Sequence, residues 1–283
     1  MMIPRAKFFK VILMAGFLFF IARGANAELN LKRLCDEDIK RVENLITKLT
    51  PLIKERDTKE NLATLTFPEL YAPLNKEEQE FLKSFQNLKA KKVGVKIPYR
   101  GMATGKEDLA VIKGQKVKMK GEPTQLPPQF LPRDVYEKYL KMMEAMEKDL
   151  GKHLYIESGY RSSAYQLYLF IFYLKNHGFS IRETAKYVTL PGFSEHGAPK
   201  HQAIDFINAQ GISGETNPKE FENLVEYEWL LKNGGKFGFV LSYPKGAPGI
   251  TFEPWHWRYE QAVFDKNKKI LAKNAKAKWC CLK

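Results

Sequence analysis

The sequence predicts an α+β protein in which a helical first part precedes a mainly antiparallel sheet with flanking helices. Two observations lead to this prediction. Residues from about Leu31 to Leu88 place apolar side chains at helical spacing among charged ones, whereas short strand patterns follow only from Lys92 on. The later helices precede or interrupt these strands without a regular strand–helix–strand repeat, which favours an α+β arrangement.

The first predicted elements are two charged helices in a region, residues 28–130, where no catalytic chemistry is evident. The stretch "DEDIKRVENLITKL" (36–49) has one apolar face, and "NKEEQEFLKSFQNL" (75–88) opens with Asn75 and Glu78 as a capping box. From Lys92 to Pro132 Gly and Pro are frequent, and short strands such as 115–120 fit between them. This segment either covers one side of a cleft or serves as a linker.

Residues 131–264 show clearer element signals and are interpreted as one domain. The Met-rich stripe in 133–150 predicts a core-facing helix that ends at Gly151. A short helix over 181–188 begins with Ser180 and Glu183 as a second capping box. The remaining elements are two helices, over 164–178 and from the Asn217 cap and Pro218 to Gly234, and strands over 153–158, 202–207, 236–243 and 249–259.

The start of the chain predicts export. Basic residues precede the apolar run 11–22, and Ala25 and Ala27 form a small-x-small cleavage pattern, so residues 1–27 are interpreted as a signal peptide. The alternative is an uncleaved membrane anchor, which the cleavage pattern disfavours. Cleavage of this signal peptide would remove four basic residues and lower the net charge from +14 to +10. We therefore expect a periplasmic or cell-wall-associated protein that favours anionic wall polymers or membrane surfaces over nucleic acid.

The ends of the chain carry two further features. Residues 265–283 form a basic tail, for which a solvated end is the expectation. The three cysteines lie near the two ends, so in an oxidising compartment Cys35 could pair with Cys280 or Cys281, and none of them looks catalytic. The sequence makes no prediction of oligomeric state.

The residues that could carry chemistry lie in three short stretches of the second half. A zinc hydrolase with an open coordination position needs three His or carboxylate ligands, a general base, and a cation or donor for the oxyanion. The stretch "PGFSEHGAPKHQAIDF" (191–206) offers two histidines and an aspartate, "EPWHWRY" (253–259) offers Glu-x-x-His, and "SGYRS" (158–162) offers an arginine on a turn. Together these residue types predict a metal-dependent hydrolase.

The same three motifs, in this order and spacing, resemble the signature blocks of the VanY-type D-alanyl-D-alanine carboxypeptidases. These are zinc peptidases that share a fold with the hedgehog signalling domain. The resemblance covers residues 131–264 and implies a hedgehog/DD-peptidase-like domain acting on peptidoglycan stem peptides. It further implies that one zinc ion is held by His196, Asp205 and His256, that Glu253 is the general base, and that Arg161 steadies the oxyanion.

Two features of the motifs leave residue assignments open. Eight residues separate His196 from Asp205, where the family usually has six, so His201 competes with His196 for the ligand role. His196 is preferred because it stands in the family block. Residues three apart in a regular strand face opposite sides, so Glu253 and His256 would need a bulge or an edge, which Pro254 permits.

Further departures and candidates concern the substrate. "SYP" (242–244) stands where the family often has Arg before Tyr-Pro, so one substrate contact is expected to be missing. Trp257 and Tyr259 either line a groove or pack in the core. The candidate substrate-binding residues are Ser194, Gln166, Tyr160 and Trp255.

The expected reaction is removal of the terminal D-Ala from D-Ala-D-Ala stem peptides. Cleavage of another peptide bond in peptidoglycan by the same site is an alternative within the same class. A non-catalytic wall-binding module is an alternative of a different class. The presence of both Glu253 and Arg161 disfavours the module, because binding alone has no evident need for them.

Overall fold

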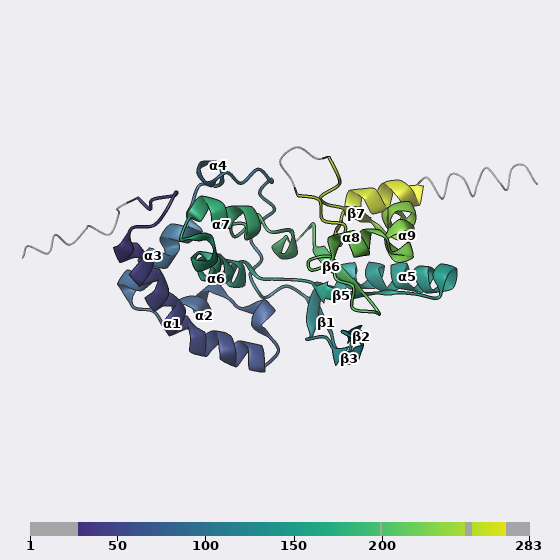
Figure 1. Cartoon of the computed structure of the whole chain (residues 1–283), viewed down its shortest axis with the longest axis horizontal. Coiled ribbons are helices and arrows are strands. Elements are labelled where there is room, and N and C mark those ends of the chain that lie inside the picture. The colour runs from purple at the N-terminus through teal and green to yellow at the C-terminus, as the bar shows by residue number, and fades with distance from the viewer. Residues whose placement is uncertain (1–27, 199, 247–250, 270–283) are drawn as a thin grey trace, which may run out of the picture.

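The computed structural model describes residues 28–198, 200–246 and 251–269. The predicted signal peptide, Cys280, Cys281 and most of the basic tail lie outside these ranges. Within them, no helix combines the length and apolar character that crossing a membrane requires. The described chain has two halves, one helical and one built around a sheet, as Figure 1 shows.

The helical half combines N-terminal helices with helices from the middle of the chain. It contains α1 (Asp36–Thr58), α2 (Phe67–Tyr71), α3 (Lys76–Gln86), α4 (Ala90–Val93), α6 (Ser163–Tyr173) and α7 (Ile181–Tyr187). Leu45 of α1, Phe85 of α3 and Phe170 of α6 are fully buried in one shared core. Residues 29–95 and residues 164–193 of the motif-bearing region therefore share one core.

Two of these helices show how local signals and packing combine. The predicted capping box at the start of α3 is confirmed, since Asn75 and Glu78 each bond to the other's backbone N–H. The first helix includes the predicted stretch 36–49 and continues through Pro51 to Thr58. Leu52 and Ile53 extend the apolar face onto the core, and we attribute the tolerance of Pro51 inside the helix to this packing.

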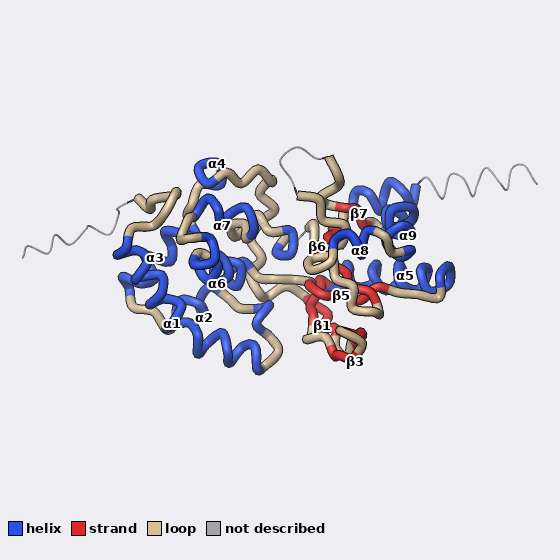
Figure 2. The backbone as a smooth tube through the Cα atoms, in the orientation of Figure 1, coloured by secondary structure: helices blue, strands red, loops and turns tan. Residues whose placement is uncertain are grey.

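The other half contains a four-stranded sheet whose strands are all antiparallel, as expected. The order is β5 (Leu154–Ser158), β6 (Ala203–Asn208), β8 (His256–Tyr259) and β7 (Phe239–Leu241). Figure 2 shows the strands gathered in this half, with long loops joining it to the helices.

One face of this sheet packs on helices, which leaves the other face for polar side chains. Phe206 of β6 and Trp257 of β8 are buried against the Met stripe of α5 (Arg133–Leu150) and against α9 (Val225–Asn233). Because side chains alternate along a strand, Asp205 and His256 point to the opposite face. These two residues are also direct cross-strand partners.

The segment 92–132 contains two small two-stranded antiparallel sheets beside the main sheet. The pairs are β1 (Leu109–Ile112) with β4 (Gln129–Pro132), and β2 (Lys116–Met119) with β3 (Glu122–Gln125). The Gln115 side chain bonds to both the N–H and the carbonyl of Ile156 in β5, each at 2.9 Å. Tyr160 N–H donates to the Phe130 carbonyl at 2.6 Å. This segment is therefore hydrogen-bonded to β5 and the loop after it, and it is not a free linker.

Several predicted element boundaries are wrong. The single helix expected from Asn217 to Gly234 is split into α8 (Pro218–Glu222) and α9, because Leu224 is extended. Asn217 makes no side-chain cap there. Ser180 caps α7 (Ile181–Tyr187) as expected by accepting from the Glu183 N–H at 3.2 Å, but the Glu183 carboxylate pairs with Lys186 instead of completing the capping box. The helix predicted over 164–178 ends at Tyr173, and a short 3-10 turn, Lys175–His177, follows it. The 3-10 helix η4 (Gly234–Phe237) occupies the start of the strand predicted over 236–243, so β7 begins at Phe239. The last strand, β8, begins only at His256.

Candidate metal centre and active site

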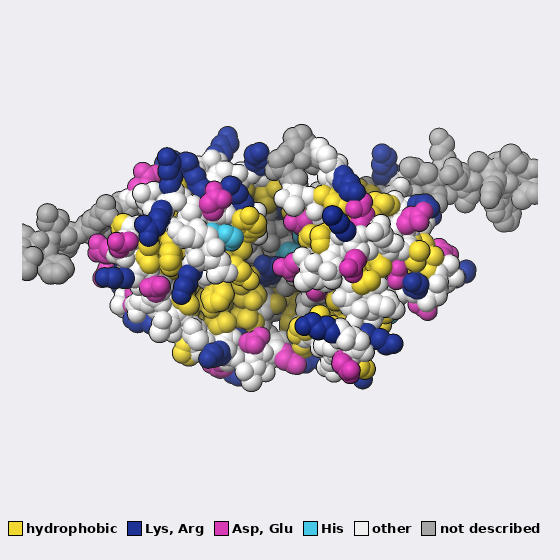
Figure 3. All heavy atoms as spheres, in the orientation of Figure 1, with side chains coloured by type: hydrophobic (Ala, Val, Ile, Leu, Met, Phe, Trp, Pro, Cys, Tyr) yellow, Lys and Arg dark blue, Asp and Glu magenta, His cyan; other side chains and the backbone are white. Residues whose placement is uncertain are grey.

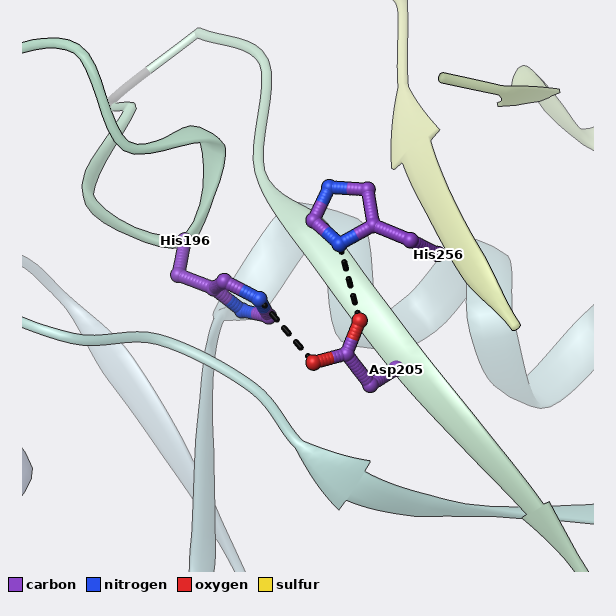
Figure 4. A group of neighbouring side chains, drawn as sticks. All are labelled: His196, Asp205 and His256. Carbon is purple, nitrogen blue, oxygen red and sulfur yellow. Dashed lines mark hydrogen bonds and ion pairs between the residues drawn. The ribbon is translucent and has the colours of Figure 1, made fainter. Parts of the chain in front are cut away.

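Three side chains from different elements converge beside the sheet (Figure 4). Asp205 comes from β6, His256 from the start of β8, and His196 from the short 3-10 helix η3 (Glu195–Gly197) in the loop before β6. The His196 Nε2 to Asp205 Oδ2 distance is 3.1 Å, and the His256 Nδ1 to Asp205 Oδ1 distance is 2.8 Å. One ligand atom from each residue lies within 4.8 Å of the others. Among the described residues this is the one such group of three.

In each imidazole ring, the nitrogen that does not face Asp205 makes a hydrogen-bond contact that orients the ring. His196 Nδ1 lies 2.8 Å from the Gly159 carbonyl oxygen, which can only accept, so Nδ1 carries the hydrogen and Nε2 offers its lone pair. His256 Nε2 lies 3.2 Å from Glu195 Oε2 and donates to it. Its Nδ1 thereby faces Asp205. Such outer partners fix ring orientation and tautomer in metal sites.

The charges of the group are strongly coupled. Burial raises the pKa of Asp205, but the two imidazoles more than offset this and hold it well below its usual range. Burial lowers the pKa of His196, and the Asp205 carboxylate only partly opposes this. Burial also lowers the pKa of His256, but Asp205 and Glu195 raise it to about 10. Without a metal, the group therefore holds a proton on His256.

These residues fit a zinc ion. Two imidazole nitrogens and one carboxylate form the three-ligand set of open zinc sites, in which one coordination position is left for water. The group is buried on the sheet, and both rings already present a chosen nitrogen to the centre. A bound dication would take the place of the proton that His256 holds, because a ligand histidine must be neutral at its coordinating nitrogen.

Glu253 lies on the same side of the molecule as the three ligands. Its Oε2 is 3.9 Å from His256 Nδ1. In place of the bulge or edge that the sequence permits, a turn at Pro254 and Trp255 separates Glu253 from β8, and the His256 N–H donates to the Glu253 carbonyl at 3.2 Å. Burial raises the pKa of the Glu253 carboxyl to about 7, and the His256 charge opposes this. A carboxyl that exchanges its proton near neutral pH is suited to general base work.

Arg161 is held in the loop between β5 and α6. Its Nη1 donates to Gln166 Oε1 at 3.2 Å, and Gln166 Nε2 donates to the Thr189 carbonyl at 2.7 Å. Burial lowers the pKa of Arg161, while the Asp205 charge opposes this. Gln166 is itself buried, so the contact that the structure shows for it is support of Arg161.

The other candidate substrate residues have structural contacts, and their contact with substrate stays a prediction. The buried Tyr160 donates its hydroxyl to Glu107 and accepts from the Gly105 N–H at 2.9 Å. Ser194 is buried immediately before η3. Trp255 packs so closely that a Cβ on Gly214 would lie 2.2 Å from its ring.

His201, the alternative ligand, points elsewhere in this structure. Its Nδ1 lies 2.8 Å from Glu260 Oε2, and it is not part of the group of three. Trp257 and Tyr259 are both buried in the core.

Sequence reasoning missed Glu195, Arg100 and Tyr243. Glu195 is 3% exposed and contacts His256, Arg100 and Arg258, and Tyr243 stacks on the His256 ring at 4.8 Å. The only signal for Glu195 was its place between Ser194 and His196 in the motif. Nothing in the sequence near Arg100 pointed to the site.

Figure 3 shows the surface recessed between the two halves of the molecule, with hydrophobic side chains gathered on the helical side. The Arg161 N–H donates to the His196 carbonyl at 3.1 Å, so two loops that connect the helical half with the sheet, one before α6 and one after α7, meet at the site.

The chain belongs to the VanY family of D-alanyl-D-alanine carboxypeptidases, whose family model matches residues 128–262. All three motifs lie in that segment. VanXYC of Enterococcus gallinarum, described as a bifunctional D-Ala-D-Ala dipeptidase and D-Ala-D-Ala carboxypeptidase, is 30% identical over 135 residues, which cover 46% of this chain and 67% of the relative. The expected resemblance and its α+β fold class are thus confirmed.

Other relatives match a smaller share of their own length. YodJ of Bacillus subtilis (strain 168) is 31% identical over 148 residues, 51% of this chain and 50% of YodJ. A D-alanyl-D-alanine carboxypeptidase of Enterococcus faecium is matched over 37% of its length. Among solved structures, the LdcB LD-carboxypeptidase has a TM-score of 0.42 and 24% identity, with 56% of this chain and 72% of LdcB covered.

Proposed function

We propose that this protein is a zinc-dependent peptidoglycan peptidase that removes the terminal D-Ala from stem peptides ending in D-Ala-D-Ala. The observation that carries the proposal is the group of His196, Asp205 and His256, in which both histidines are buried, with Glu253 beside it. Membership of the VanY family and the activity described for VanXYC support the choice of substrate. The single zinc ion is part of the proposal.

The proposed chemistry is hydrolysis of an amide bond. When bound, zinc supplies a Lewis acid that polarises the scissile carbonyl and lowers the pKa of the attacking water. Glu253 takes a proton from that water and later gives it to the leaving D-Ala amine. The Arg161 guanidinium donates hydrogen bonds to the oxygen on which negative charge develops.

The rest of the site keeps these groups in place. Gln166 holds the Arg161 guanidinium through a 3.2 Å hydrogen bond. Asp205 and His256 are fixed as cross-strand partners, and Gly159 holds the His196 ring by its carbonyl. This arrangement favours an enzyme over a binding module, because a partly buried arginine and a carboxyl with a raised pKa add cost without adding to the metal ligands.

We further propose that the protein is exported and acts in the periplasm or at the cell wall. The apolar run and small-residue pattern within residues 1–27 support export. The strongly basic composition supports attraction to anionic wall polymers or membrane surfaces.

The test is incubation of the protein with pentapeptide muropeptides, followed by mass analysis. We expect loss of one D-Ala with the unaltered chain, and none with Glu253→Ala at equal metal content. A tetrapeptide arm and a crosslinked-dimer arm identify cleavage of other bonds. Binding of muropeptide without cleavage in any arm would refute the peptidase and support the wall-binding module.

A further inference from the structure

We infer that Arg100 is a positioning residue of the metal centre, acting through Glu195 on His256. Arg100 lies outside the family-matched residues 128–262, in the segment between α4 and β1. The inference rests on the metal site of the proposed function and assigns a role at that site to the N-terminal region.

The segment around Arg100 is closely fitted to the loop that carries His196. The Arg100 N–H donates to the Gly192 carbonyl at 2.7 Å. Gly192 has a φ of +83°, and a Cβ there would lie 2.4 Å from the Tyr99 ring. Tyr99 in turn packs edge-on against Phe193, with ring centroids 5.4 Å apart. Backbone and side-chain contacts on both sides of Arg100 therefore fix where its guanidinium lies.

The guanidinium meets a buried carboxylate. Arg100 Nη2 lies 2.8 Å from Glu195 Oε1, with 16% of the arginine side chain and 3% of the glutamate side chain exposed. The other oxygen, Oε2, accepts from His256 Nε2 at 3.2 Å. Oε1 of Glu195 therefore binds Arg100, and Oε2 binds His256. A carboxylate this buried is costly unless a cation and hydrogen bonds satisfy it.

Arg258 is the other cation near Glu195, but it is committed elsewhere. Its Nη1 is 3.8 Å from Glu195 Oε1, whereas its Nε donates to Glu260 Oε1 at 2.6 Å. Glu260 also contacts His201, which lies in the eight-residue stretch between His196 and Asp205. Arg100 is therefore the closer partner and the one hydrogen-bonded to Glu195.

The consequence for the metal centre follows from the geometry of His256. While Glu195 Oε2 accepts from Nε2, the ring presents Nδ1 to Asp205 and to the metal position. Loss of an outer partner of this kind typically weakens metal affinity about 10- to 100-fold. Without Arg100, Glu195 loses its nearest cation, and its hold on the ring becomes weaker.

The sign of the effect separates positioning from simple electrostatics. Arg100 is positively charged, so through space it repels a bound cation, and its removal alone would strengthen metal binding. Positioning through Glu195 predicts the opposite result.

The test measures zinc affinity of the full chain by competition with a chromogenic chelator, without any substrate. We expect Arg100→Gln to weaken zinc binding by about tenfold. Arg100→Lys, which keeps the charge but not the forked donor, should fall between the unaltered chain and Arg100→Gln. In a Glu195→Gln background, Arg100→Gln should have no further effect.

The matched control is Lys113→Gln, which removes one positive charge and an exposed ion pair with Glu60 from the same region. It should leave zinc affinity unchanged. Zinc affinity of Arg100→Gln equal to or above that of the unaltered chain, or independent effects in the double variant, would overturn the inference. If Arg100→Gln does not fold, the Arg100→Lys arm in both backgrounds decides by the same criterion. Because no substrate is present, failure of this inference is distinct from failure of the peptidase assay.

Discussion

Glu253 is expected to destabilise the metal-free protein at neutral and alkaline pH. Burial raises the pKa of its carboxyl from 4.5 to about 7, with help from nearby acids and against the charge of His256. That difference corresponds to about 3 kcal/mol at about 1.36 kcal/mol per pKa unit. With 31% of the side chain exposed, solvent screening reduces the expectation to about 2 kcal/mol.

The pH dependence has a definite sign. Because the folded-state pKa lies above the unfolded one, the folded protein binds the extra proton between pH 4.5 and about 7. The free energy of unfolding contributed by Glu253 is therefore lost as pH rises through this window. Glu253→Gln removes the titration, so its stabilising effect should be small at about pH 5 and close to its full size at about pH 8.

Urea unfolding of chelator-treated protein at these two pH values measures the difference. Glu144→Gln, at an exposed position of α5, controls for the removal of an acid as such. A stability gain in Glu253→Gln that is equal at both pH values, or a loss at the higher pH, would refute the assignment of a raised pKa to this carboxyl.

Four further predictions test the site. Burial lowers the pKa of His256, but Asp205 and Glu195 raise it to about 10, so zinc binding at about pH 7 should release about one proton from this residue. Calorimetry in buffers of different ionisation enthalpy measures the released protons, and a result of no proton release would contradict this prediction. His196→Ala should lose bound zinc and His201→Ala should keep it, and elemental analysis showing the reverse would exchange the two roles. Arg161→Ala should lower kcat/KM by about 10²- to 10³-fold at unchanged metal content, whereas an unchanged rate would remove it from the reaction. Gln166→Leu should lower kcat about tenfold by freeing Arg161, and an effect on KM alone would assign it to substrate instead.

The parts of the fold that the sequence predicts well are those with strong local signals. The helix over 133–150 has the expected bounds, because a continuous apolar stripe and Gly151 in a left-handed conformation define it. The strand around Asp205 was expected from its apolar run and lies within one residue of the prediction. The split between α8 and α9 was not foreseen, because the Asn217 and Pro218 signals mark a start but nothing marks the extended Leu224.

The candidate ligands and base were found through the motifs, but their supporting contacts were not. Glu195 and Arg100 lie 95 residues apart in sequence and 2.8 Å apart in space. A charged side chain is normally exposed, so sequence alone gives no reason to expect either one in the interior. The position of Glu253 relative to His256 depended on a turn that Pro254 permits without requiring.

The most direct test of the central claim is a zinc titration of D-Ala release. Metal-stripped protein is mixed with a pentapeptide ending in D-Ala-D-Ala, and free D-Ala is measured as zinc is added. We expect activity to rise to saturation at one zinc per chain, and Glu253→Gln to bind the same amount of zinc without releasing D-Ala. Full activity in the stripped protein, or D-Ala release by zinc-loaded Glu253→Gln at the unaltered rate, would contradict this expectation.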